Sequence, residues 1–145
     1  MPEPAIPTTI LAFDFGQRRI DVAVGQTITG SASPLGIVAN GDNGPDESRI
    51  EALIDEWRPD LLVVGLPLQA DGTEGDVAKA VRAFARDLER FELGIETCDE
   101  RLSSKEAEAT LVRARQEGSR GRLSKSDIDA AAAVVIAERY LASIA

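Results

Sequence analysis

The sequence predicts an α/β fold, in which a five-stranded mixed sheet combines an antiparallel meander with two parallel strands and carries helices on both faces. Three strand-like segments follow one another at turn-length spacing within the first forty residues, as in a meander. Two further apolar segments are each preceded by a stretch with helical periodicity, as crossovers between parallel strands require. At 145 residues the chain suits one domain, expected over residues 9–145 after a tail of residues 1–8.

The meander is expected to come first. Residues 9–15 form an apolar run that Gly16 ends, residues 19–26 alternate between apolar and polar side chains, and residues 31–38 are expected to form a third strand. The gaps between these segments are too short for crossover helices, so the three strands should be antiparallel.

The next elements are expected to be a helix and a buried strand. Residues 46–57 carry apolar side chains at helical spacing, and Arg58 and Pro59 end that pattern. Residues 61–65 are wholly apolar, which is typical of a strand near the centre of a parallel sheet.

A second crossover and two further helices complete the predicted fold. Thr73 and Asp76 resemble a capping box for a helix that reaches about Phe91 and buries one apolar stripe: Val77, Val81, Phe84 and Leu88. Residues 94–100 should form the fifth strand, and residues 103–117 and 125–143 should form helices. This order is the plan of ribonuclease H-like folds, whereas a flavodoxin-like fold alternates strand and helix from the start.

Composition excludes several kinds of chemistry. The chain has no histidine, which removes Ser-His-Asp triads, Cys-His nucleophiles and histidine zinc sites. Cys98 is the only cysteine, so no internal disulfide can form, which suits the reducing cytoplasm, where we expect the protein. We expect no signal peptide and no membrane span.

The charge is unevenly distributed. The net charge of −9 argues against a nucleic-acid partner. Residues 113–125, however, carry five basic residues against one glutamate, a local charge of +4: Arg113, Arg115, Arg120, Arg122 and Lys125. This basic stretch could contact a polyanion, or it could be a solvated loop.

Asp14 is the first candidate for chemistry, because it interrupts an apolar strand. Burial of an unpartnered carboxylate costs several kcal/mol, so the position indicates either a metal ligand near the strand's end or an edge position that faces solvent. Gly16 would let a phosphate approach, and Arg18 and Arg19 could contact it, or they could be ordinary turn charges.

Two later carboxylates can be grouped with Asp14. Glu100 follows the fifth strand, where ligands gather in α/β sheets, although acidic residues there could simply favour the next helix N-terminus. Asp129 opens the last helix beside residues 130–133, all alanine, which permit close packing, although alanine is also a good helix former. Asp127 is explained as a helix cap with Ser124.

These three carboxylates are expected at one end of the sheet. Hard oxygen ligands favour Mg²⁺ or Mn²⁺, and two such ions about 3.5–4 Å apart can support in-line phosphoryl displacement without histidine.

The ordered motifs resemble the YqgF family, also described as Holliday junction resolvase-like proteins or pre-16S rRNA nucleases. The matching segments are residues 11–16, 22–25, 65–75, 99–103 and 129–134. The resemblance implies a ribonuclease H-like fold, the acidic set Asp14, Glu100 and Asp129, and maturation of the 5′ end of small-subunit ribosomal RNA. Asp21 departs from the family's usual glycine, and Gly65 stands where true junction resolvases tend to have a glutamate.

We therefore expect a Mg²⁺- or Mn²⁺-dependent endonuclease that acts on structured RNA and can associate with the ribosome. Asp14, Glu100 and Asp129 are expected to bind the metal and to be catalytic. The residues expected to contact nucleic acid are Arg18, Arg19, Arg101, Arg113, Arg115, Arg120, Arg122 and Lys125. Two alternatives stay open: a nuclease for branched DNA, and a non-catalytic RNA-binding factor in ribosome assembly.

Overall fold

The computed structural model describes residues 8–67, 71–99 and 131–144. Its strands are β1 (Thr9–Phe15), β2 (Arg19–Gln26), β3 (Ser31–Ala39), β4 (Leu61–Leu66) and β5 (Gly94–Asp99). Its helices are α1 (Glu47–Trp57), α2 (Asp76–Leu88), the short 3-10 turn η1 (Glu89–Phe91) and α5 (Ala131–Ile144). The helix predicted over residues 103–117 lies outside the described residues.

The sheet has the strand order β3-β2-β1-β4-β5. The β1–β2 and β2–β3 pairs are antiparallel, and the β1–β4 and β4–β5 pairs are parallel. The predicted meander and the two parallel strands are therefore confirmed. Every residue of β4 is buried, as its unbroken apolar sequence predicted for a strand with neighbours on both sides.

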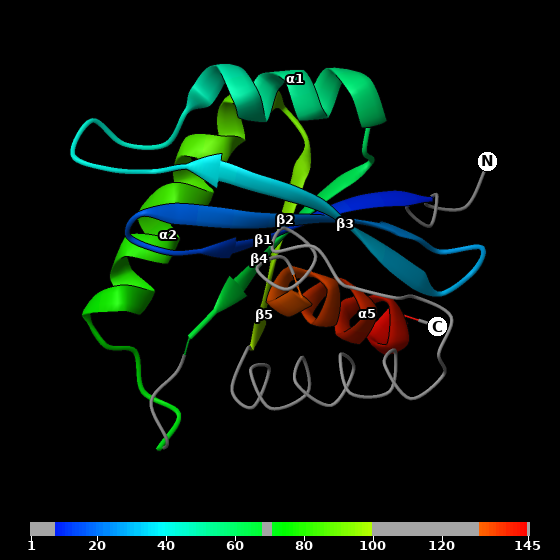
Figure 1. The fold of residues 1–145 in the computed structure, drawn as a ribbon. Coiled ribbons are helices and arrows are strands. Elements are labelled where there is room, and N and C mark those ends of the chain that lie inside the picture. Colours follow the sequence, from blue (N-terminus) through cyan, green and yellow to red (C-terminus); the bar gives the residue numbers. More distant parts are fainter. Residues whose placement is uncertain (1–7, 68–70, 100–130, 145) are drawn as a thin grey trace, which may run out of the picture.

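Helices cover both faces of the sheet (Figure 1). On one face, side chains of α1 and α2 pack with alternate residues of the strands, among them Leu11, Phe13 and Leu62. On the other face, α5 packs against Ile10, Ala12 and other residues of β1 and β4. Because successive side chains of a strand point to opposite faces, this division tells on which face each residue of β1 lies.

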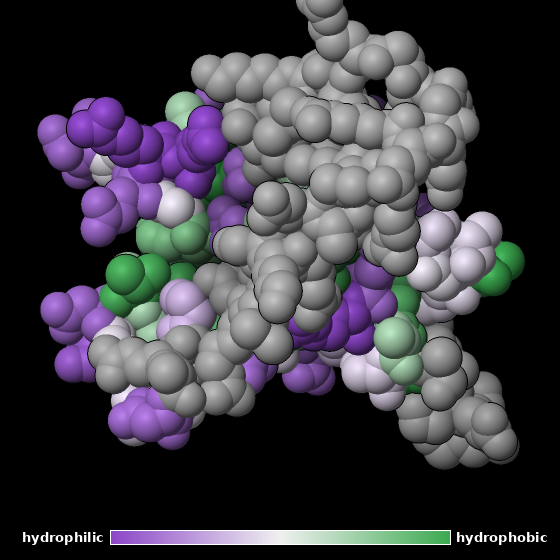
Figure 2. Space-filling view, turned by 60° about the horizontal axis from the view of Figure 1, so that its bottom comes forward, coloured by the Kyte–Doolittle hydropathy of each residue, from purple (hydrophilic) through white to green (hydrophobic). Residues whose placement is uncertain are grey.

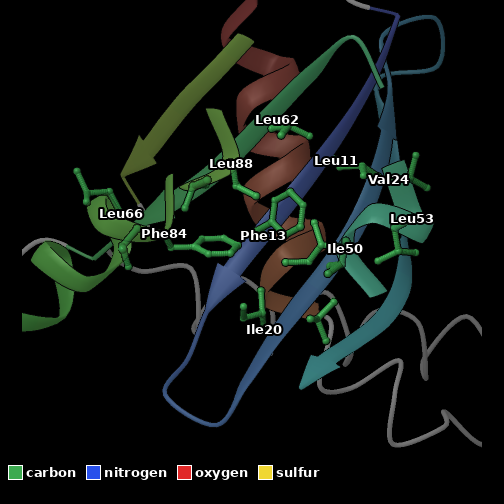
Figure 3. Close-up of a cluster of buried hydrophobic side chains, with 14 of the residues drawn as sticks. Leu11, Phe13, Ile20, Val24, Ile50, Leu53, Leu62, Leu66, Phe84 and Leu88 are labelled. Carbon is green, nitrogen blue, oxygen red and sulfur yellow. The ribbon is translucent and has the colours of Figure 1, made fainter. Parts of the chain in front are cut away.

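The larger core lies between the sheet and the helices α1 and α2 (Figure 3). Phe13 is fully buried and meets Phe84 of α2 edge-on, with ring centroids 5.7 Å apart. Leu11, Ile50 and Leu88 surround this pair in the same cluster. Burying aromatic rings of this size makes a large contribution to stability, so this cluster fixes α2 against the sheet.

Both ends of α1 are capped by hydrogen bonds to residues nearby in the sequence. The Asp46 side chain accepts a hydrogen bond from the Arg49 backbone N–H, which caps the first turn. Arg58 ends the helix in the left-handed region, with φ 45°, and its N–H donates to the Ile54 carbonyl. The predicted helix over residues 46–57 is confirmed.

Two predictions about α2 are wrong. Its N-cap is Gly75, with no side-chain cap, because Thr73 instead donates from both its N–H and its hydroxyl to the Asp71 carboxylate. This local turn uses the Thr73 hydroxyl before the helix begins. Val77 is also 49% exposed, and Ala78 takes the buried position beside Val81, Phe84 and Leu88.

Helix α5 has a defined direction across its face of the sheet. Near its end, Leu141 approaches Gly25 and Ile10: a Cβ on Gly25 would lie 3.1 Å from Leu141 Cδ1 and 3.0 Å from Ile10 Cγ1. Near its beginning, Ala133 and Val134 pack on Ala23. The first described turn of α5 therefore lies toward the end of the sheet at which β1 finishes and β2 starts.

The described surface in Figure 2 is mostly hydrophilic, with small hydrophobic areas between the polar side chains. The large hydrophobic residues exposed in the described ranges are Ile28 and Val77. None of the helices in residues 8–67, 71–99 and 131–144 is long and apolar enough to cross a membrane.

Candidate active site

Asp14 and Asp21 are directly opposite each other on β1 and β2. Asp21 is only 8% exposed, and Asp14 is half-buried. Strand β1 lies between β2 and β4, so the alternative that Asp14 occupies a sheet edge is wrong. Residues directly opposite in an antiparallel pair have Cβ atoms about 4.5–5.5 Å apart, so the two carboxylates are close neighbours.

Both carboxylates lie on the face that α5 covers. Ala12, two residues before Asp14, packs in the cluster that contains Ile136 of α5. Ala23, two residues after Asp21, packs against Ala133. Side chains two apart on a strand share a face, so Asp14 and Asp21 point to the side of the sheet where α5 begins.

The same level of the sheet continues across β4 and β5. Phe13 lies beside Val64, which brings Gly65 to the level of Asp14, and Gly65 is paired with Cys98. Gly65 has no side chain, so the space between Asp14 and β5 is not filled from β4. Strands β1, β4 and β5 are parallel, so their carboxyl ends meet at this edge of the sheet.

Two predicted site residues flank described elements but lie outside the described residues. Glu100 directly follows Asp99, the last residue of β5, and Asp129 is two residues before Ala131, where α5 is first described. The backbone of Asp99 is joined to α5, because Arg139 Nη1 donates a 2.8 Å hydrogen bond to the Asp99 carbonyl. Within residues 8–67, 71–99 and 131–144, no set of three acidic or cysteine side chains forms a metal-binding group.

A tight turn follows Asp14 and connects β1 to β2. A Cβ on Gly16 would lie 2.6 Å from the Arg19 carbonyl oxygen, so only glycine fits this close approach. Asn40, from the end of β3, holds the same turn: its side-chain Nδ2 donates to the Gly16 carbonyl at 2.6 Å, and its backbone N–H donates to the Arg18 carbonyl at 2.9 Å. The turn is thus fixed from a third strand.

Asn40 was not among the residues predicted for the site. The partner of Asn40 is 24 residues away along the chain, so no local pattern could have shown the contact.

Some of the residues predicted to contact nucleic acid are in the part of the chain that the structure describes, and the others are outside it. Arg18 and Arg19 are exposed on the turn beside Asp14 and Asp21. The others lie outside the described residues: Arg101, Arg113, Arg115, Arg120, Arg122 and Lys125.

The strand order, with an antiparallel meander followed by two parallel strands and helices on both faces, is that of a ribonuclease H-like fold. The chain matches the sequence model of the family described as "RuvX: Holliday junction resolvase" over residues 8–143. It therefore belongs to this family, the YqgF family that its motifs resemble.

Relatives and solved structures agree with this assignment. A protein of Pectobacterium carotovorum named "Putative pre-16S rRNA nuclease" is 48% identical over 91% of this chain and 94% of its own. A protein of the same name from Escherichia coli O157:H7 is 47% identical with the same coverage. The structure of Thermus thermophilus RuvC in complex with a Holliday junction substrate superposes with a TM-score of 0.56 at 15% identity, over 94% of this chain and 95% of that one. This last similarity concerns the fold.

Proposed function

We propose that this protein is a Mg²⁺- or Mn²⁺-dependent endonuclease that hydrolyses phosphodiester bonds in structured RNA and matures the 5′ end of pre-16S ribosomal RNA. The observation that carries the proposal is the pair Asp14 and Asp21, two adjacent carboxylates on the covered face at the carboxyl end of a central strand. The names of relatives that are nearly half identical over nine-tenths of the chain support the choice of substrate.

The donor set fits a hard divalent cation. Asp14 supplies carboxylate oxygens, which Mg²⁺ and Mn²⁺ prefer, the Asp21 carboxylate lies opposite it, and the chain has no histidine with which to select zinc. We propose Asp14, Glu100 and Asp129 as the metal ligands. Glu100 is joined to the end of β5, and Asp129 to the beginning of α5, so the chain connections favour their approach to Asp14.

Asp21 adds a negative charge to this set. Two carboxylates opposite each other repel, and a bound cation would offset that repulsion. We propose that Asp21 strengthens the attraction of the site for the metal, rather than replacing one of the three ligands. Asp21 is only 8% exposed, which suits a residue that acts on the metal site without direct contact with the substrate.

In the proposed mechanism, the chain positions the scissile phosphate and holds the reacting groups. Divalent metal ions, when bound, supply an activated water and stabilise the leaving oxygen in such reactions. Asp14 is held by its central strand, and the tight turn at Gly16 fixes the backbone that follows it. Arg18 and Arg19 are exposed on that turn, where they can contact flanking phosphates and position the strand without reading its sequence.

A nuclease for branched DNA is the second candidate. The description of the family as a Holliday junction resolvase favours it. Gly65 weighs against it, because this place at the end of β4 holds no carboxylate. We also propose a cytoplasmic location and association with the pre-ribosome, which the sole cysteine and the proposed RNA substrate support.

The test is a cleavage assay with purified protein on two substrates. One is an RNA that spans the 5′ precursor junction of 16S RNA, and the other is a four-way DNA junction, each with Mg²⁺, Mn²⁺ or EDTA. We expect metal-dependent cleavage of the RNA, lost in Asp129→Asn and retained in Asp127→Asn. Cleavage of the DNA junction alone would support the second candidate, and binding of RNA without cleavage would support a non-catalytic assembly factor.

A further inference from the structure

A pocket of about 380 Å³ opens on the opposite side of the sheet from Asp14 and Asp21. It lies where three segments meet: the β1–β2 turn, the loop between β3 and α1, and the middle of α2, which lie at the same end of the molecule in Figure 1. Phe15, which packs on the α1 and α2 side, forms part of its wall. Its volume is within the range of ligand sites, about 300–1,000 Å³.

The wall of the pocket combines aromatic and acidic groups. Phe15 and Phe84 lie against each other with ring centroids 5.1 Å apart, and Phe84 is 3% exposed, so the aromatic part of the wall is anchored in the core. Asp42 on the loop and Asp87 on α2 are the charged residues among those that line the pocket, and both are exposed. Lysine and arginine do not line it.

The pocket is held in shape by contacts independent of any ligand. Asn40 ties the loop to the β1–β2 turn through the Gly16 carbonyl. Within the loop, the Gly44 N–H donates to the Gly41 carbonyl at 2.9 Å, with Gly44 at φ 85°, where glycine is favoured. The Asp46 N–H donates to the Ala39 carbonyl at 2.9 Å, which closes the loop at its base. A preformed site loses less conformational entropy when a ligand binds.

The aromatic and acidic groups of the wall favour a planar cation, one face of which can pack on an aromatic ring. Two carboxylates would repel a phosphate, so the pocket does not suit the backbone of a nucleic acid. A guanidinium group can donate paired hydrogen bonds to a carboxylate and stack on a phenylalanine ring, which a lysine ammonium does less well. Ala80 and Ala83 are small, and they leave the entrance over α2 open to a long side chain.

We propose that this pocket binds an arginine side chain presented by a protein partner. The guanidinium lies between the carboxylates of Asp42 and Asp87, and its flat face and alkyl stem lie against Phe15. The site is separate from the acidic edge at Asp14, because it is on the other face of the sheet.

The test is a titration of the ¹⁵N-labelled full chain with a blocked arginine, N-acetyl-arginine-N-methylamide, followed by amide chemical shifts. We expect saturable shifts at Gly41, Gly44 and Ala83 within tens of millimolar ligand. Blocked citrulline, which has the same shape without the charge, should bind about tenfold more weakly, a difference of ~1.4 kcal/mol. The double change Asp42→Asn with Asp87→Asn should weaken arginine binding at least as much, whereas Asp55→Asn, an exposed change on α1, should not.

Three results would overturn the proposal: no saturable shifts at these amides, equal binding of arginine and citrulline, or an unchanged affinity in the double variant. Tighter binding of a nucleoside monophosphate than of arginine would also overturn it. Thermal unfolding of the double variant checks that its fold is intact, and Ala83→Leu, which fills the entrance without a change of charge, should abolish the shifts independently. These readouts do not depend on nuclease activity, so the proposal and the proposed function can fail separately.

Discussion

Asp14 and Asp21 are register partners on adjacent antiparallel strands, and both lie on the sheet face that α5 covers. A sheet does not gain stability from two carboxylates at opposed positions, because like charges directly opposite are destabilising. We propose that a cation and a phosphate reach Asp14 at the carboxyl end of β1, beside Gly65, which has no side chain. This relationship leads to the first prediction.

Replacement of either carboxylate should leave the metal-free protein as stable as the parent or more stable. Asp21→Asn and Asp14→Asn each remove one of two opposed charges, so in EDTA we expect the free energy of unfolding to rise by ~0.2–1 kcal/mol or stay unchanged. Urea denaturation with and without Mg²⁺ measures it, and the stabilisation by Mg²⁺ should shrink in both variants. A loss of stability well above ~1 kcal/mol in EDTA would show a structural role instead.

The turn after Asp14 should tolerate no side chain at Gly16. A Cβ there would lie 2.6 Å from the Arg19 carbonyl oxygen, so Gly16→Ala forces the backbone to move and should cost ~1–3 kcal/mol in the free energy of unfolding. Gly41→Ala is the matched control, because a Cβ at Gly41 meets nothing within 4 Å. Equal denaturation midpoints for the two variants would mean that the turn is not constrained as described.

The strands could be predicted closely from the sequence. Thr9–Phe15 and Arg19–Gln26 were both predicted with their observed bounds, because apolar side chains that can be buried distinguish these segments from the turns beside them. The sheet order followed from the lengths of the connections. Asp14 was singled out because a carboxylate in an apolar strand has no local explanation, and it indeed lies on a central strand.

The parts that could not be predicted depend on contacts between distant segments. Asn40 looked like an ordinary loop residue until its hydrogen bond to Gly16 was known. Thr73 matched a capping pattern, but competition from Asp71 decided its partner. The pairing of Asp21 with Asp14 requires the register of the hairpin, which a one-residue change in the turn would alter. The pocket beside Phe84 joins three separate segments, so no single stretch of sequence indicates it.

The link between Thr8 and Asp60 should make stability depend on pH at the acidic end. Hydrogen bonds from the Thr8 hydroxyl and from the Thr8 and Thr9 N–H groups lower the pKa of Asp60 below its usual 3.8. A lowered pKa stabilises the folded state above the usual value, and this stability is lost as the pH falls through the lowered pKa. Thr8→Val should therefore cost up to ~1 kcal/mol at pH 7, since the pair is exposed, and much less near pH 2.

Chemical denaturation across that pH range, with Asp55→Asn as the control, measures this dependence. A Thr8→Val deficit that persists unchanged at acidic pH would show that the hydrogen bonds to the Asp60 carboxylate are not its cause.

The basic stretch should affect substrate binding more than chemistry. Arg120 and Arg122 belong to a segment of charge +4 that precedes Asp129 in the sequence. Replacement of both by alanine should weaken RNA binding, and each lost phosphate contact should lower the slope of log affinity against log salt by roughly 0.7–0.9. Cleavage at saturating RNA should change less. If affinity and slope are both unchanged, substrate contacts must be sought at Arg18, Arg19 and Arg101.

The most direct measurement is the rate of metal-dependent cleavage of the pre-16S RNA by Asp14→Asn beside Asp55→Asn, with Mn²⁺ titrated in both. Even residues that only orient metal ligands typically contribute 10–100-fold to metal affinity or activity, so loss of a direct ligand should reduce cleavage on the order of 100-fold or more. We expect Asp14→Asn to fold, to bind RNA and to lose cleavage and Mn²⁺ affinity together, while Asp55→Asn retains both. Parent-like cleavage and Mn²⁺ affinity in folded Asp14→Asn would contradict the assignment of this edge of the sheet as the metal-dependent active site.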